Sequence, residues 1–442
     1  MVSLTYRLAE LYAADPFTTI EQARTSLGLG RSQMAALLQD FPGSPEGRDR
    51  LLAGPSAKYW QNTILPLETA GVLDAVLENK VRYPYRVGLY PGPTCMFRCS
   101  FCVRVTGERY PADALADGND LLERVIDELP QDDPHRLYFS GGLEPLTNPG
   151  TERLAARAAA RGFKVALYTN AFTLTPRTLS SQLGLWDLAG IRVSLYGLSE
   201  EEYVRTTGKR GAFARVAANL REFLHARHRE DRRTHLGLNY IILPGAVHRL
   251  PLLVDYIADL NRAAPDRPID FVTLREDYSG RTSGKIADAE RADLRTALRE
   301  FADRAAKLTP TLRVDRGYAL ESVAAGVDAE MLRVPASDLR PTAHPQAAVQ
   351  IDLLGDVYLY REAGFPGLKG ADRYIAGRIG PDTGLIDVME DFVGKRQEIA
   401  PLPGDEQFLD GFDQVVTARL RQLEADVRQG WPDHRGLIRM AA

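Results

Sequence analysis

Three cysteines are the residues of this chain whose type and spacing point most directly to chemistry. Cys95, Cys99 and Cys102 follow a C-x3-C-x2-C spacing, and no other cysteine occurs in the 442 residues. A disulfide framework would need an even number of cysteines, spread out to close long loops. Thiolates this close together predict one soft metal centre, either a zinc ion or an iron–sulfur cluster. Because each normally takes four protein ligands, zinc would also need a histidine, and a cluster would keep one iron open, as catalytic metal sites do.

The cysteine motif, with aromatic Phe101 before its last cysteine, resembles the signature of the radical S-adenosylmethionine (SAM) enzymes. That resemblance implies a 4Fe-4S cluster held by three cysteines, whose open iron binds the amino and carboxylate groups of SAM. It also implies an external one-electron reductant such as flavodoxin or ferredoxin, since one electron cleaves SAM to methionine and a 5'-deoxyadenosyl radical. An incidental cysteine cluster and a structural zinc site are the alternatives.

A glycine pair follows the apolar run 136–139. Gly141 and Gly142 lack side chains that would obstruct a ligand, and Leu143 and Glu144 continue the string as Ser-Gly-Gly-Leu-Glu-Pro. This string resembles the glycine-rich Glu-Pro motif of the family, which implies that its backbone holds the methionine end of SAM. Leu143 stands where the family commonly has a third glycine. For a glycine pair alone, a plain turn is the alternative.

Polar residues that close later apolar runs are further candidates for binding SAM. Thr169 and Asn170 close one run, and Ser194 closes the next with a hydroxyl that could hydrogen-bond the ribose. Phe101 could pack on the adenine. The alternative for each residue is local: nearby groups could satisfy the polar side chains, and the phenyl ring could simply pack in the loop.

The segment Arg275-Glu-Asp-Tyr-Ser-Gly-Arg281 is too polar for a protein core and follows the last apolar run of the series. Glu276 or Tyr278 could relay a proton. Arg275 or Arg281 could hold a phosphate through charge-assisted hydrogen bonds. A solvated loop would explain the same composition.

Three more residues are candidates for contact with a substrate. Tyr196 follows closely after Ser194, and Arg361 closes a predicted hairpin. His344 lies in the rigid string Arg-Pro-Thr-Ala-His-Pro, where a structural role is the preferred interpretation.

Longer strings narrow the resemblance within the family. They resemble the radical SAM ammonia-lyases of macrolide deoxysugar (desosamine) biosynthesis, from about residue 15 to the C-terminus. The resemblance implies a dTDP-amino sugar as substrate and removal of its C4 amino group. The alternatives are another radical SAM sugar enzyme (a dehydrogenase, diol dehydratase or epimerase) and an iron–sulfur electron-transfer protein. The strings include KYWQNTILPLE from Lys58, VGLYPGPTCMFRC from Val87, SGGLEPLTNP from Ser140, REDYSGR from Arg275 and RPTAHPQ from Arg340.

Alternating strands and helices must position these residues. Repeated β–α units from residue 85 to residue 310 predict a parallel sheet with ligands at the carboxyl ends of its strands. Six units predict an α/β fold built on a partial (β/α)6 barrel, which the family resemblance also implies. The predicted strands are 86–90, 136–139, 164–168, 191–195, 236–243 and 269–274.

Two regions flank the predicted barrel. Residues 1–84 have apolar residues at helical spacing, which predicts an N-terminal helical cap. Residues 311–442 predict a C-terminal α+β extension, with a hairpin around Gly355-Asp356 and a terminal helix over 408–428. Because this extension contains no cysteine, it cannot hold an auxiliary cluster on thiolates.

The composition argues against several other classes of protein. The chain has 55 Lys and Arg against 59 Asp and Glu, a net charge of -4, whereas a general nucleic-acid binder needs clustered cations. No apolar run reaches the ~18 residues of a membrane helix, and the N-terminus has no signal pattern. We therefore expect a cytoplasmic protein that binds neither nucleic acid nor membrane.

Overall fold

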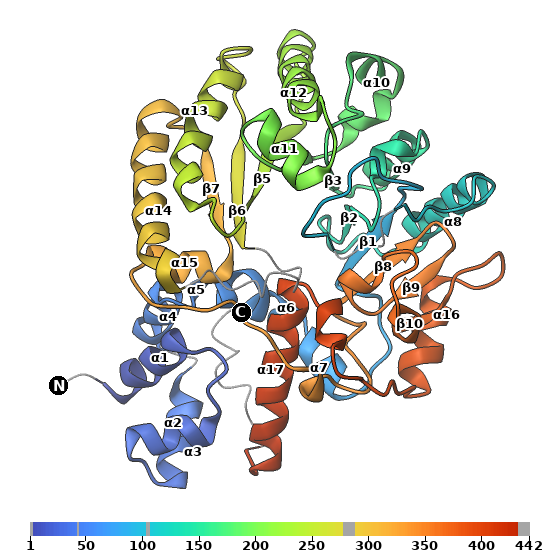
Figure 1. Cartoon of the computed structure of the whole chain (residues 1–442). Coiled ribbons are helices and arrows are strands. Elements are labelled where there is room, and N and C mark those ends of the chain that lie inside the picture. The colour runs from blue at the N-terminus through green and yellow to red at the C-terminus, as the bar shows by residue number, and fades with distance from the viewer. Residues whose placement is uncertain (1–2, 42–43, 103–106, 277–287, 432–442) are drawn as a thin grey trace.

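The computed structural model describes residues 3–41, 44–102, 107–276 and 288–431. Its centre is a ten-stranded sheet in the order β10-β9-β8-β1-β2-β3-β4-β5-β6-β7 (Figure 1). Strands β1 to β7 are adjacent in chain order and pair in parallel. They are β1 (Arg86–Tyr90), β2 (Leu137–Phe139), β3 (Ala166–Thr169), β4 (Gly190–Leu195), β5 (His235–Ile242), β6 (Phe271–Glu276) and β7 (Arg313–Arg316).

The sheet confirms the predicted partial barrel. All six predicted strands are present, with both ends of β1 as predicted and the ends of the others shifted by at most two residues, and β7 is an additional seventh parallel strand. The sheet is not closed, because β10 and β7 are its two ends. The segment Arg313–Arg316 gave no strand signal because a single apolar residue, Val314, lies among charged ones, as suits a partly exposed edge.

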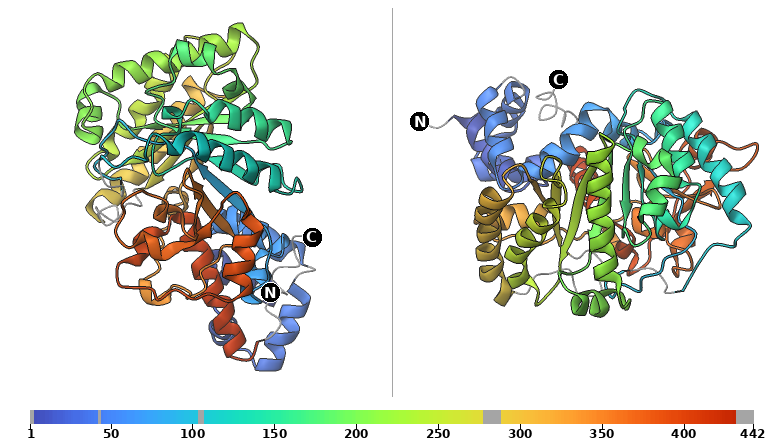
Figure 2. Two further views of the ribbon diagram at one scale, coloured as in Figure 1. Left: turned by 90° about the vertical axis from the view of Figure 1, so that its right-hand side faces the viewer. Right: turned by 90° about the horizontal axis from the view of Figure 1, so that it is seen from above.

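Helices between the parallel strands cover one face of the curved sheet (Figures 1 and 2). Their apolar sides and the strands form a large core that includes Val87, Leu122, Ile191, Leu238 and Phe301. These helices are α8 (Ala114–Glu128), α9 (Thr151–Ala160), α10 (Pro176–Ser181), α11 (Glu200–Thr207), α12 (Ala212–Arg229), α13 (Leu250–Asn261) and α14 (Asp288–Leu308).

The predicted C-terminal hairpin is confirmed and joins the main sheet. Strands β8 (Ala348–Asp352) and β9 (Asp356–Tyr358) are antiparallel, and β10 (Ile375–Arg378) continues from β9. Gly355 in the turn has φ +79°, and a Cβ there would lie 2.5 Å from the Ile379 carbonyl oxygen, so only glycine fits. Strand β8 pairs in parallel with β1, opposite β2.

The N-terminal region is helical, as predicted, and packs against the last helix of the chain. Leu8, Trp60, Val415 and Trp431 share one apolar cluster, and α17 (Gly411–Arg428) lies beside this region in Figure 1. The remaining helices are α1 (Leu4–Ala14), α2 (Ile20–Leu27), α3 (Arg31–Asp40), α4 (Pro45–Ala53), α5 (Ala57–Tyr59), α6 (Leu65–Thr69), α7 (Val72–Leu77), α15 (Tyr318–Ala324) and α16 (Leu385–Met389). None of the helices that the structure describes is both long and apolar enough to cross a membrane.

Candidate active site

The cysteine loop follows β1 and is held against the end of α11. The backbone amides of Arg98 and Ser100 donate to the carbonyl oxygens of Thr207 and Thr206, each at 2.8 Å. These carbonyls belong to the last turn of α11, where helical carbonyls lack partners within the helix. The helix end therefore fixes the loop that carries the cysteines.

The three cysteines are half-buried. Burial raises the pKa of Tyr196 well above its ordinary value, and the charges of Cys99, Cys95, Glu144 and Cys102 raise it further. The three thiols and the Glu144 carboxylate therefore act electrostatically on the same ring.

No group of three or more His, Cys, Asp or Glu side chains is placed to hold a metal ion among the described residues. The cysteine loop is therefore identified as a cluster site by its motif and not by converged thiols.

The glycine loop after β2 packs directly on the cysteine loop. The amide of Glu144 donates to the Thr94 carbonyl oxygen at 2.9 Å, and a Cβ on Gly92 would lie 2.6 Å from the Glu144 carbonyl carbon. A Cβ on Gly142 would lie 2.6 Å from the Gly364 carbonyl oxygen, so this position needs glycine for backbone packing. Leu143, the departure from the family motif, is buried in the core with 5% exposure.

Glu144, Thr169 and Asn170 form one hydrogen-bond network. Glu144 Oε1 accepts from the Thr169 hydroxyl at 2.5 Å, and Oε2 accepts from the Asn170 backbone amide at 2.8 Å. Burial raises the pKa of Glu144, while these donors oppose the rise. Asn170 Nδ2 also reaches Met96 Sδ at 3.2 Å, so the network connects β2 and β3 to the cysteine loop.

Phe101 and Tyr196 line a cavity of about 470 Å³ at the ends of β4 and β5. Their rings are stacked, with centroids 5.8 Å apart and an interplanar angle of 26°. Leu243 and Pro244 lie on the other side of the cavity. Ser194 lies two residues before Tyr196 in β4 and is half-buried.

Arg361 reaches into the barrel from the segment after β9. Its guanidinium donates to Asp410 Oδ2 at 3.1 Å and to Ser140 Oγ at 3.4 Å. It also lies over the rings of Tyr138 and Tyr168, 5.2 and 5.4 Å from their centroids. The structure therefore brings Arg361, far away in the sequence, next to the glycine loop.

His344 supports Arg361 from behind. Its side chain is fully buried, and Nε2 lies 3.4 Å from Asp413 Oδ1. The other oxygen of Asp413 accepts from the Arg361 backbone amide at 3.0 Å. His344 also packs on Tyr360, with ring centroids 5.2 Å apart.

Arg275 and Glu276 lie on opposite faces of β6, because neighbouring strand residues alternate. Glu276 is 2% exposed, and its Oε1 accepts from the Leu320 amide at 2.8 Å, near the start of α15. The charge of Arg275 acts on Tyr168, which places it toward the barrel interior. Tyr278 and Arg281 lie outside the described residues.

Two interior residues, Tyr168 and Arg192, were absent from the sequence-based candidates. They lie in β3 and β4. The sequence feature that could have identified them is a polar side chain within each apolar run. Burial would raise the pKa of Tyr168, but the guanidinium groups of Arg192, Arg361 and Arg275 bring it below its ordinary value. The interior of the barrel is therefore strongly cationic around this phenol.

Residues 89–247 match the model of the Radical SAM superfamily, a span that contains the cysteine loop and strands β2 to β5. An open parallel barrel with the C-x3-C-x2-C loop after its first strand, together with this match, defines a radical SAM enzyme. Its cofactors are SAM and an iron–sulfur cluster. The chain belongs to the family of the dTDP-4-amino-4,6-dideoxy-D-glucose ammonia-lyase, and is thus an enzyme with lyase activity.

The relative that shows this membership is the dTDP-4-amino-4,6-dideoxy-D-glucose ammonia-lyase of Streptomyces venezuelae. It is 57% identical over 433 residues, 98% of this chain and 89% of the relative. The AdoMet-dependent heme synthase of Methanosarcina barkeri is 31% identical over 126 residues, 28% of this chain and 35% of that protein. Among solved structures, SuiB of Streptococcus suis bound to S-adenosylmethionine is similar, with 15% identity and a TM-score of 0.49, covering 85% of this chain and 80% of that chain.

Proposed function

We propose that this protein deaminates dTDP-4-amino-4,6-dideoxy-D-glucose to dTDP-3-dehydro-4,6-dideoxy-D-glucose. The reaction releases ammonia and consumes SAM to 5'-deoxyadenosine and methionine. The observation that carries the proposal is the 57% identity to the Streptomyces venezuelae ammonia-lyase across 98% of the chain. The cysteine loop after β1 and the cationic barrel interior are consistent with it.

Cys95, Cys99 and Cys102 would hold a 4Fe-4S cluster with one open iron for SAM. When bound, these cofactors supply a 5'-deoxyadenosyl radical that removes the hydrogen from C3 of the sugar. The loss of a proton from the resulting hydroxyl-bearing carbon radical would help to expel the C4 ammonium group, and the sugar radical that remains would take up one electron from the external donor and one proton to give the 3-keto product. Two observations on this chain support the assignment. The charges of the three thiols all raise the pKa of Tyr196, and the loop that carries them is hydrogen-bonded to the end of α11.

Residues at the strand ends would hold and orient SAM. The backbone at Gly141 and Gly142 would approach its methionine end, in a loop braced by the Glu144 network with Thr169 and Asn170. Ser194 would hydrogen-bond the ribose. Phe101, stacked on Tyr196 at the 470 Å³ cavity, would pack on the adenine.

Tyr278 remains our proposed proton-transfer residue, because the side chain of the other sequence-based candidate, Glu276, faces α15 and not the barrel interior. Burial raises the pKa of Glu276, so its carboxyl group binds a proton more tightly than an exposed glutamate does. Its Oε2 has no hydrogen-bond partner within the part of the chain that the structure describes, so this oxygen is available to a proton. The barrel walls would exclude water from the site, which strengthens each electrostatic contact in it.

An external one-electron donor such as flavodoxin or ferredoxin would reduce the cluster. Arg98 is exposed in the cysteine loop, and Arg205 and Arg210 are exposed where α11 meets that loop. Cations around the cluster would attract an acidic donor and increase its rate of association. Loss of donor-dependent turnover at high ionic strength, with dithionite-dependent turnover retained, would support this role.

The decisive experiment is turnover of the amino-sugar nucleotide by reconstituted, reduced enzyme under anaerobic conditions. We expect 5'-deoxyadenosine and ammonium in equal amounts. Formation of 5'-deoxyadenosine without ammonium would contradict the lyase proposal, and the mass of the sugar product would then identify a dehydrogenase, dehydratase or epimerase. An electron-transfer protein would show no change of its cluster EPR signal on addition of SAM.

A further inference from the structure

A second cavity, of about 310 Å³, lies inside the barrel on the inward faces of β2, β3, β4 and β8. Strands β2 and β3 contribute Tyr138 and Tyr168, β4 contributes Arg192, and β8 contributes Gln350. Arg361 closes its inner end, beside the glycine loop, through the hydrogen bond to Ser140. The inner end of the cavity is therefore next to the glycine loop, with Arg361 between the two.

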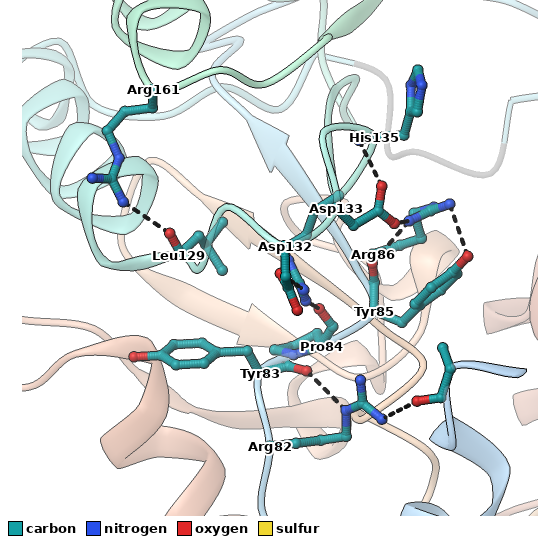
Figure 3. A network of polar contacts seen from close by, with 12 residues as sticks. Arg82, Tyr83, Pro84, Tyr85, Arg86, Leu129, Asp132, Asp133, His135 and Arg161 are labelled. Atoms are coloured by element: carbon teal, nitrogen blue, oxygen red, sulfur yellow. Dashed lines mark hydrogen bonds and ion pairs between the residues drawn. The ribbon is translucent and has the colours of Figure 1, made fainter.

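The outer end of this cavity lies at the amino ends of the strands and carries Arg86 and His135. Figure 3 shows that Arg86 is already engaged: its Nη1 lies 2.5 Å from Asp133 Oδ2, and its Nη2 donates to Tyr85 Oη at 3.2 Å. Asp133 offsets the charge of Arg86, and Asp410, which also lines the cavity, offsets that of Arg361, so neither is the cation that remains unpaired for an anionic ligand.

Arg192 is such a cation. Among the described residues, Arg192 forms no ion pair. Its one hydrogen bond to them runs from Nη1 to Thr273 Oγ1 at 3.3 Å. Its guanidinium lies over the rings of Phe271 and Tyr168, 4.7 and 5.6 Å from their centroids. Aromatic rings support its charge without neutralising it, so an anion would gain the full attraction.

Gln350 supplies an independent sign of a missing ligand. It is 1% exposed, and its Nε2 donates to Tyr138 Oη at 3.2 Å. Its Oε1 is buried and has no hydrogen-bond partner among the residues that the structure describes. A buried acceptor without a donor is costly, so we expect a ligand hydroxyl or amide to satisfy it.

We propose that Arg192 binds the diphosphate of the nucleotide sugar inside the barrel, beside the Tyr168 ring, and that Arg361 orients the diphosphate from its ion pair with Asp410. This inference rests on the proposed function. Arginine is suited to such a site because its planar fork can bind two phosphate oxygens at once. A diphosphate at Arg361 would place the attached sugar next to Ser140 and the glycine loop, where SAM would be cleaved. The assignment moves the diphosphate from the sequence-based candidates Arg275 and Arg281 to Arg192 and Arg361.

The test is the affinity of the reconstituted protein for dTDP, measured by calorimetry in the presence of SAM and without reductant. We expect Arg192→Gln to weaken dTDP binding by at least tenfold and Arg192→Lys by less. The affinity for SAM should change by less than twofold in both variants, which shows that the fold is intact. As a matched control, Arg157→Gln on the outer helix α9 should leave dTDP binding unchanged.

Three outcomes would overturn the inference: no binding of dTDP by the wild-type protein, equal dTDP affinity in wild type and Arg192→Gln, or equal losses in Arg192→Gln and Arg192→Lys. A loss seen with Arg275→Gln alone would restore the sequence-based assignment. Because dTDP binding needs no turnover, the result is separate from the proposed reaction. A protein that deaminates the sugar while Arg192→Gln binds dTDP normally would retain the function and lose only this site.

Discussion

The Thr169 hydroxyl donates a hydrogen bond to Glu144 Oε1 at 2.5 Å and so ties the end of β3 to the loop after β2. The Asn170 backbone amide occupies the other carboxylate oxygen. Since burial alone would favour the protonated form of Glu144, these donors stabilise its charge. The network holds together the two loops that we assign to SAM and to the cluster.

Removal of this hydroxyl should therefore loosen the cofactor site. We expect Thr169→Val to lower the affinity for SAM by about fivefold, because a hydrogen bond to a buried charged group is worth about 1–3 kcal/mol. Calorimetry with reconstituted protein would measure the change. Thr296→Val, at an exposed position of α14, is the control and should bind SAM normally. Unchanged affinity in Thr169→Val would show that the network does not position SAM.

The cluster assignment predicts that each cysteine is essential. We expect Cys102→Ala to form no 5'-deoxyadenosine and to lose the EPR signal of a reduced 4Fe-4S cluster, because the cluster would keep only two thiolates. Iron content and chromatography of the nucleoside measure both effects. Ser100→Ala, an exposed position in the same loop, should retain iron and SAM cleavage. Full activity of Cys102→Ala would refute the assignment.

Glu276→Gln tests the structural role of Glu276 against α15. We expect the variant to form ammonium and 5'-deoxyadenosine in the wild-type ratio, because the side chain faces away from the barrel interior. The free energy of unfolding should change little, because the glutamine Oε1 can still accept from the Leu320 amide, whereas release of ammonium at least ~10-fold more slowly would reveal a general acid–base role. Glu321→Gln, on the same helix, is the control. An unchanged ratio of ammonium to deoxyadenosine would leave Glu276 with the structural role alone.

Stability should decrease as the pH rises from about 5 to 8. Burial raises the pKa of Glu362 to about 7 and those of Asp352 and Asp426 to about 6. Between their unfolded and folded pKa values, these carboxyl groups bind more protons in the folded state, so deprotonation favours unfolding. The stabilisation is complete below the unfolded pKa and is lost as the pH rises through the folded pKa.

Glu362 offers a direct check of this pH dependence. Glu362→Gln cannot lose a proton, so its melting temperature should fall less between pH 5.5 and pH 8 than that of the wild type. The difference corresponds to on the order of 2 kcal/mol. Glu201→Gln, an exposed position of α11, should keep the wild-type dependence. Parallel curves for wild type and Glu362→Gln would place the titration elsewhere.

The sequence predicted the elements of the barrel because local patterns determine them. Apolar runs located β1 to β6, and the loops after β1 and β2 were assigned from cysteines and glycines at strand ends. The interior residue Arg192 was missed because attention to strand ends overlooks side chains that point inward from within a strand, and Tyr168 was missed because, as the last residue of its predicted strand, it was counted as part of the apolar run. Their meaning depends on Arg361, whose approach requires the folding of a distant segment.

The orientation of Glu276 shows another limit. The predicted strand ended at Leu274, whereas β6 continues to Glu276, so Arg275 faces the barrel and Glu276 faces α15. Alternate residues of a strand point to opposite faces of the sheet. Because β6 continues past its predicted end, this alternation also determines that one of its last two side chains faces inward and the other outward. Apolar periodicity stops being informative where polar residues begin, and this is where active sites lie.

The parallel pairing of β1 with β8 joins Arg86 to Ala348. During synthesis, the strand that leads into the cysteine loop therefore remains an unprotected edge until the C-terminal part of the chain has left the ribosome. Exposed edges of this kind pair with other chains and promote aggregation. A C-terminal truncation that removes β8 would accordingly reduce soluble yield as well as remove Arg361 from the site.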